Sequence, residues 1–169
     1  MTKEKLSVTS AIRFLREHQI DFIECPYQYE EHGGTETAAD ELGVDEHLVI
    51  KTLVMEDEEK KPFIILMHGD KEVSTKSLAR TVGVKSVRPC APEVALKHTG
   101  YRVGGISPFG TKKRLPIYIE ETILDLPRIF INAGRRGLLA EMSPLNLNRV
   151  LNPIPVGVAR ESFKKGEKQ

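Results

Sequence analysis

The segment from Gly104 to Gly110 has the composition of a loop that binds a ligand through its main chain. Its two adjacent glycines, Gly104 and Gly105, can adopt backbone conformations that other residues avoid, and they let a ligand approach main-chain N–H groups. Ser107 precedes Pro108 and is therefore biased toward an extended backbone. Such a loop could hold an adenosine, a carbonyl oxygen or a phosphate, and a plain turn is the alternative. It matches neither a P-loop nor a Gly-x-Gly-x-x-Gly dinucleotide motif.

A second glycine-bearing segment spans residues 132–137 and follows a predicted strand at 128–131. It offers the polar side chain of Asn132, main-chain N–H groups at Ala133 and Gly134, and two arginines. Two such loops at strand ends could face one pocket. Taken by itself, each segment fits an ordinary turn better.

Lys51 interrupts an apolar run from Val49 to Met55. Strand alternation places Lys51 on one face with Val49, Leu53 and Met55. A lysine on an apolar face either lies at the mouth of a cavity or extends its ammonium to solvent from an edge. In a cavity it would need an anionic or carbonyl partner, because a desolvated charge without a partner is costly.

The other residues that could do chemistry give mostly negative indications. The five histidines show no His-x-x-x-His spacing, so no metal site is predicted. Cys90 lies near basic residues and could be a thiol of low pKa, although a small buried cysteine is the more common case. The sequence contains no Gly-x-Ser-x-Gly motif of a serine hydrolase. We therefore expect neither a metal nor another cofactor.

Charge is distributed unevenly along the 169 residues, although the formal net charge is only +1. Residues 1–60 contain six Lys and Arg against fifteen Asp and Glu. Residues 85–114 contain seven Lys and Arg against one Glu, and this local excess could attract RNA. An uneven solvated surface is the alternative interpretation.

The composition is that of one domain over residues 1–169 with a polar tail at 161–169. Apolar residues make up 40% of the chain, which is enough for a core. Two cysteines exclude a disulfide-dense scaffold. The sequence has neither an apolar run long enough to span a membrane nor an N-terminal signal segment, so we expect a cytoplasmic protein.

The elements that must position these residues alternate irregularly, which predicts an α/β fold with a mixed sheet and packed helices. Predicted helices span 9–19, 35–42, 75–83, 92–99 and 143–151, with a helical turn at 120–126. Predicted strands span 21–25, 49–55, 62–67, 101–106, 115–119, 128–131 and 138–142. Helix ends are marked by the expected caps Thr9 or Ser7, Thr35, Ser74 or Thr75, and Ser143, by Pro92 and Pro144 at first positions, and by Gly43, Gly83 and Gly100.

Three motifs in order resemble the YbaK family, which comprises aminoacyl-tRNA deacylases related to the editing domain of prolyl-tRNA synthetase. Its Gly-x-x-x-Pro signature matches Gly104 to Pro108 within the segment 99–116. Its Lys-Thr-Leu segment matches residues 51–53, and its glycine loop with two basic residues matches 134–137. The similarity extends from about the first helix to Arg160.

The resemblance implies a mixed, barrel-like sheet and a pocket for the 3′-terminal adenosine of tRNA and its esterified amino acid. It assigns the essential lysine to Lys51 and the main-chain amides of the catalytic loop to Gly105, Ile106 and Ser107. It assigns substrate contacts to Tyr27, Thr52, Gly104, Pro108, Asn132, Ala133 and Gly134. Aminoacyl-tRNA and, in a ternary complex, prolyl-tRNA synthetase are the implied partners.

The resemblance further implies that the substrate's own thiol cleaves Cys-tRNA(Pro), which would explain why no protein nucleophile is evident. Three positions depart from the YbaK pattern: Asn132-Ala133 replaces Ser-Gly, a small residue near Ala38 replaces an aromatic, and Leu139 replaces an acid. A changed pocket wall can change which amino acid is admitted, so the resemblance supports the deacylase class more firmly than the cysteine specificity. The alternatives are a deacylase for Ala or another small residue, and a non-catalytic binder of nucleotide or RNA on the same scaffold.

Overall fold

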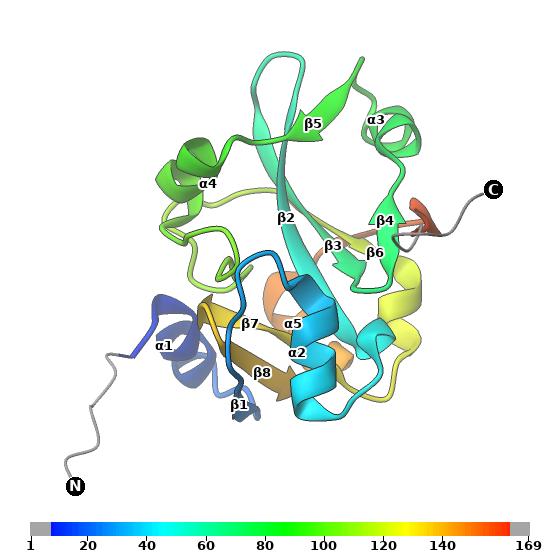
Figure 1. The fold of residues 1–169 in the computed structure, drawn as a ribbon. Coiled ribbons are helices and arrows are strands. Elements are labelled where there is room, and N and C mark those ends of the chain that lie inside the picture. The colour runs from blue at the N-terminus through cyan, green and yellow to red at the C-terminus, as the bar shows by residue number, and fades with distance from the viewer. Residues whose placement is uncertain (1–7, 163–169) are drawn as a thin grey trace, which may run out of the picture.

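The computed structural model describes residues 8–162 and contains one large mixed sheet flanked by helices (Figure 1). The strands are β1 (Ile23–Pro26), β2 (Val49–Asp57), β3 (Pro62–His68), β4 (Lys71–Val73), β5 (Val87–Pro89), β6 (Ile117–Glu120), β7 (Ile129–Arg135), β8 (Leu138–Met142), β9 (Ile154–Val156) and β10 (Ala159–Glu161). The helices are α1 (Ser10–Glu17), α2 (Gly34–Leu42), α3 (Thr75–Val82), α4 (Pro92–Thr99) and α5 (Pro144–Leu151), with short 3-10 helices η1 (Glu46–Leu48) and η2 (Glu121–Asp125). This confirms the predicted fold class.

The large sheet has the order β1-β8-β7-β2-β3-β6-β9, and β5 also pairs with β2. The pairs β2–β7, β3–β6 and β6–β9 are parallel, and the other pairs of this sheet are antiparallel. A second sheet consists of β10 and β4 alone. No helix within residues 8–162 is long and apolar enough to cross a membrane.

The central hairpin β2–β3 separates two apolar cores. Along β3, Ile64 and Leu66 belong to the first core, whereas Ile65 and Met67 belong to the second core. Alternating side chains point to opposite faces of a strand, so a strand covered on both faces needs a continuous apolar run. The uninterrupted run of β3 therefore identifies it as a strand buried on both sides.

The helix caps are largely those that the sequence predicts. The side chains of Thr9, Ser74 and Ser143 accept hydrogen bonds from main-chain N–H groups in the first turns of α1, α3 and α5. Gly43 and Gly100 end α2 and α4 in the left-handed conformation, with φ of 67° and 82°. These local signals fix where the helices begin and end.

The predicted cap at Thr35 is wrong. Gly33 occupies the N-cap position of α2 and makes no side-chain hydrogen bond there. The Thr35 hydroxyl instead donates to the Glu46 carboxylate at 2.7 Å and lies 3.2 Å from the Gly69 carbonyl oxygen. The Thr35 hydroxyl therefore bonds to acceptors outside α2 and does not cap the helix.

Two further expectations need correction. Residues 101–106 form a loop rather than a strand, because Gly104 has φ of 92° and the Tyr101 hydroxyl donates to the carbonyl of Phe109 at 2.5 Å. The expected tail begins one residue too early, since Glu161 is the last residue of β10 and pairs with Lys71 of β4. Residues 163–169 lie outside the described part of the chain.

Candidate active site

A cavity of about 860 Å³ opens where the sheet divides along β2. On one edge of β2, β7 pairs with Val49 and Ile50, whereas β5 pairs with residues 55–57. Residues 51–54 therefore have no strand neighbour on that edge within the described chain. Figure 1 shows β2 passing between α4 on one side and α3 on the other, with α2 in front. The cavity volume is that of typical small-molecule sites.

The main chain of Thr52 points into this gap. Val49 accepts a hydrogen bond from Gly69 on the β3 side, whereas Val54 accepts one from Cys90 on the opposite side. Because successive residues of a strand alternate in the direction of their N–H and C=O groups, both groups of Thr52 face the gap. The Thr52 hydroxyl is also buried, and it has no hydrogen-bond partner among the described residues. Buried polar groups are nearly always paired, so Thr52 indicates a place for a ligand.

Lys51 lines the same cavity and is half-buried. Burial lowers the pKa of its ammonium, while the charges of Glu46, Glu72 and Asp70 oppose that shift. None of the ion pairs within residues 8–162 involves Lys51. The sequence left open a cavity position or extension to solvent, and the structure places this cation at the cavity.

The glycine loop meets the cavity at Gly104 and Ile106 but not throughout its length. The Gly105 N–H already donates to the Arg102 carbonyl at 2.8 Å. Ser107 is fully buried behind the wall, and its hydroxyl accepts from the Phe109 N–H at 3.2 Å. The N–H of Ile106 makes no such main-chain hydrogen bond among the described residues. The N–H of Gly104 makes none either, so Gly104 and Ile106 are the two loop residues at the cavity whose N–H groups are available to a substrate oxygen. Pro108 is buried and lies outside the lining as well.

Asn132 ties the glycine loop to β7. Its amide nitrogen donates to the Gly104 carbonyl at 3.1 Å, and its amide oxygen accepts from the N–H of Gly134 at 2.7 Å. The side chain thus replaces ladder hydrogen bonds where the register of β7 shifts between Asn132 and Arg135. Residues 132–135 are a bulged part of β7, not the loop that the sequence predicted. Asn132 lines the cavity, whereas Ala133 is fully buried and, like Gly134, does not line it.

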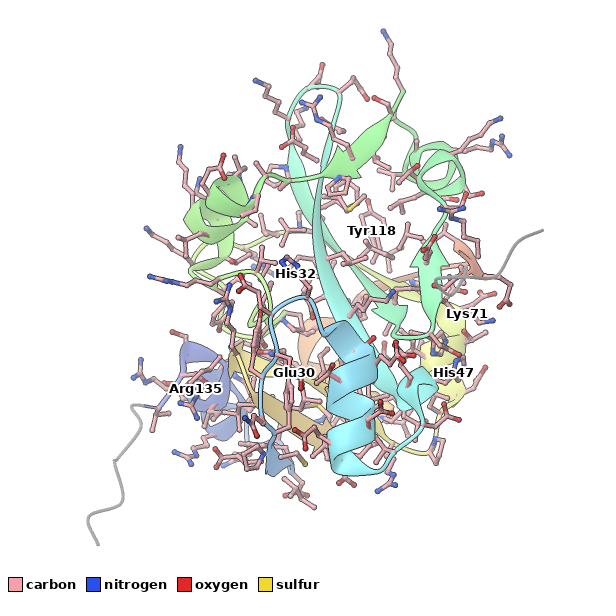
Figure 2. The ribbon with its side chains drawn as sticks, viewed as in Figure 1. Glu30, His32, His47, Lys71, Tyr118 and Arg135 are labelled. Carbon is pink, nitrogen blue, oxygen red and sulfur yellow. The ribbon has the colours of Figure 1, made fainter. Side chains whose placement is uncertain are left out.

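One wall of the cavity is formed by the irregular segment between β1 and α2, of which the sequence predicted only Tyr27 as a site residue. Tyr29, Glu30 and His32 also line the cavity. Figure 2 shows Glu30 and His32 on the segment that leads into α2. The guanidinium of Arg136 lies 5.0 Å from the centre of the Tyr29 ring. An irregular segment has no periodicity, so only its tertiary contacts reveal it.

Cys90 lines the cavity but is not a nucleophile of low pKa. Burial, with a hydrogen bond to Glu56 and the charge of Glu56, raises the pKa of its thiol to about 12. Arg88 holds the Glu56 carboxylate through two nitrogens at 3.1 and 2.9 Å. Arg88, the basic neighbour, therefore pairs with Glu56, and the Cys90 thiol stays protonated at neutral pH.

His47, His68 and Asp70 form the one cluster of possible metal ligands among the described residues. Sequence spacing did not show it, because the two histidines come from different elements. Both nitrogens of His68 are already paired, with the His47 carbonyl at 2.9 Å and the Thr122 hydroxyl at 2.7 Å. The two imidazole rings stack at 3.8 Å and 4°. Lone pairs lie in the ring plane, so parallel rings do not direct them to one point, and the cluster does not fit a metal.

Residues 30–150 match the family model described as "Aminoacyl-tRNA editing domain". The chain belongs to this family. The resemblance seen in the sequence is thereby confirmed, and the protein is an enzyme of the aminoacyl-tRNA deacylase class.

Individual relatives of this editing domain support the same family assignment. A protein of Enterococcus faecalis named "Putative Cys-tRNA(Pro)/Cys-tRNA(Cys) deacylase EbsC" is 32% identical over 146 residues, covering 85% of this chain and 89% of that protein. A proline–tRNA ligase of Limosilactobacillus fermentum is 27% identical over 104 residues, covering 59% of this chain and 18% of the ligase. A crystal structure described as "a putative trans-editing enzyme for prolyl tRNA synthetase" superposes with a TM-score of 0.78 at 24% identity, covering 92% of this chain and 99% of that one. This last likeness shows the fold.

Proposed function

We propose that this editing domain acts in trans and removes cysteine from Cys-tRNA(Pro). The observation that carries the proposal is the set of polar groups at the open edge of β2. Lys51 supplies a cation, and Thr52 supplies a buried hydroxyl that has no hydrogen-bond partner within residues 8–162, beside main-chain groups that face the gap. An ester of a terminal adenosine offers the oxygens that these groups require. The name of the E. faecalis relative supports the choice of cysteine.

The chemistry needs no protein nucleophile. The substrate's thiolate attacks its own ester carbonyl, so that a C–S bond forms and the C–O bond to the ribose oxygen breaks. The thiol proton ends on that ribose oxygen, and the amino acid leaves as a thiolactone. The Ile106 N–H would stabilise the negative charge that develops on the carbonyl oxygen, and one such donor is worth roughly 3 kcal/mol. Lys51 would hold the ester or phosphate oxygens in place.

An alanyl ester is the second candidate, and the cavity wall gives the reason. Ala38 and Leu139 both line the cavity and are 1% and 4% exposed. These apolar side chains occupy the two positions where the YbaK pattern has an aromatic and an acid. Such a wall admits a methyl side chain as well as a thiol, and one small group changes the discrimination by only about 1–3 kcal/mol.

The test compares release of Cys, Ala and Ser from the same tRNA(Pro), with wild type and Lys51→Ala side by side. We expect fast release of Cys by wild type only, and slow release of Ser, because a hydroxyl is far less acidic than a thiol. Lys51→Arg is the matched control, since it keeps the positive charge and should retain part of the activity. Faster release of Ala than of Cys would exclude thiol attack as the required step. Release of none would leave binding without turnover.

We also propose that prolyl-tRNA synthetase completes the complex. The formal charge of +1 is low for a protein that must hold tRNA alone. The sequence similarity to a segment of proline–tRNA ligases supports a shared tRNA. Addition of the synthetase should lower the KM for Cys-tRNA(Pro), and an unchanged KM would count against the ternary complex.

A further inference from the structure

A second hollow, of about 520 Å³, is lined by α3 and by the segment that leads into β5. Figure 1 shows α3 on the opposite side of β2 from α4. Lys76 and Arg80 of α3 line one wall, and Lys85 lines the other. All three side chains are exposed, and no ion pair within residues 8–162 involves any of them. We call this hollow the basic groove.

The fold concentrates these cations on facing walls. Lys76 and Arg80 are four residues apart on α3 and therefore share one helix face. The buried Leu78 and Ala79 fix that helix against the second core. The carboxylate of Glu58 lies close by, since it accepts hydrogen bonds from the Lys85 and Ser86 N–H groups at 2.8 and 3.3 Å. Three cations against one carboxylate leave the groove positive.

The basic groove lies next to the substrate cavity, because Thr75 lines both. Glu72, which lines the cavity three residues before Thr75, forms an ion pair with Arg160 at 2.8 Å. On the α2 side, the exposed residues Glu36, Asp40 and Glu41 would repel a polyanion. A chain of phosphates that leaves the cavity therefore meets attraction along α3 and repulsion along α2.

We propose that the basic groove binds the phosphates of the RNA strand that leads to the terminal adenosine. The proposal rests on the proposed function, because the adenosine itself must occupy the cavity. It defines the direction in which the 3′ strand of the tRNA leaves the site: the strand passes Thr75 and runs along α3. RNA is favoured over an acidic protein surface because the groove adjoins a site for a nucleotide end.

The test removes the charge with Lys76→Ala, Arg80→Ala and Lys85→Ala combined. The matched control is Arg13→Ala, Lys60→Ala and Arg149→Ala, which removes three exposed cations that lie outside both the basic groove and the basic stretch 85–114. The first readout is fluorescence anisotropy of a labelled single-stranded oligoribonucleotide copying the 3′ end of tRNA(Pro). We expect at least a tenfold rise in Kd for the groove variant and less than a twofold rise for the control.

Salt dependence provides a second measure. Each lost contact to a single-stranded phosphate lowers the slope of log K against log salt by about 0.7, so three contacts lower it by about 2. Kd and slope unchanged in the groove variant, or changed equally in both variants, would overturn the proposal. In the first case the groove would serve another anion, such as an acidic protein face.

Deacylation separates this proposal from the proposed function. The groove variant should lose kcat/KM toward aminoacyl-tRNA through KM, and it should keep wild-type activity on aminoacyl-adenosine, which lacks the upstream phosphates. If wild type releases no amino acid while the groove variant still binds RNA weakly, the proposed function fails and the groove assignment stands. If wild type is active and the groove variant equals it on both substrates, the groove assignment fails alone.

Discussion

At Gly105 the glycine loop packs closely against the backbone of Arg135 and Arg136, where β7 turns into β8. A Cβ on Gly105 would lie 2.8 Å from the main-chain nitrogen of Arg136 and 2.9 Å from the carbonyl carbon of Arg135. Ordinary contact begins at 3.4 Å, so Gly105→Ala must separate the two segments by about 0.6 Å. Backbone atoms cannot turn away as a flexible side chain can. Unlike Gly104, with φ of 92°, Gly105 does not have a left-handed φ, and the clash is therefore the only cost.

Overpacking of this kind costs about 1–3 kcal/mol of unfolding free energy. For a chain of this length that corresponds to a fall in Tm of about 2–12 °C. Gly104 and Ile106, on either side of Gly105, line the cavity. The displacement therefore also moves the Ile106 N–H, which is proposed to donate to the substrate. A misplacement of 1 Å costs on the order of a hundredfold in rate, so we expect kcat/KM to fall roughly tenfold or more.

The assay is thermal unfolding together with deacylation of Cys-tRNA(Pro), and Gly157→Ala is the matched control. A Cβ on Gly157 would meet only the Glu121 side chain at 3.5 Å, an ordinary contact, and its φ is not left-handed. That control should keep wild-type activity and stay within about 1 kcal/mol of wild-type stability. If Gly105→Ala unfolds within 1 °C of wild type and deacylates normally, the close approach does not position the loop and the reasoning is wrong.

Other predictions concern four side chains. Thr52→Val should raise the free energy of unfolding by about 1 kcal/mol, because it removes a buried hydroxyl without a partner, while kcat/KM falls 2- to 10-fold; parallel losses of both would contradict a ligand role. Burial lowers the pKa of Lys51, so wild-type deacylation, corrected for spontaneous hydrolysis, should decline on the alkaline side before that of Lys51→Arg does; coincident profiles would remove Lys51 as the titrating group. Cys90→Ala should keep at least half of wild-type kcat/KM, since a thiol with a pKa of about 12 stays protonated; abolished turnover in a folded variant would make Cys90 the nucleophile. Burial lowers the pKa of His68, so the unfolded chain takes up the proton first and stability falls as the pH drops below about 6.5; urea unfolding at pH 7.5 and 5 should show a smaller loss for His68→Gln, and an equal loss would assign the effect to other groups.

Local features of the sequence were sufficient where a local interaction decides the structure. Thr9, Ser74 and Ser143 cap their helices because the donor N–H groups lie two or three residues away. The face shared by Lys51, Leu53 and Met55 follows from strand alternation, and the latter two pack in the second core as expected. The sequence motifs also sufficed to assign the family.

Four short strands were not predicted, because contacts with distant parts of the chain decide whether they form. The strands β4, β5, β9 and β10 have three residues each, too few to show a period of two. They exist because a neighbouring strand offers hydrogen-bond partners, as β2 does for β5. Among them, β5 and β4 frame the cavity, so part of the site was invisible in the sequence.

The sequence by itself determined most of the helix caps, the central hairpin and the residue types of the site. Only the tertiary structure decided which of those groups meet a substrate. It turned Asn132 inward so that its amide donates to the Gly104 carbonyl, and it left the Thr52 hydroxyl without a partner among the described residues. Each outcome depends on which donor or acceptor arrives from a distant part of the chain, and spacing along one strand cannot encode that.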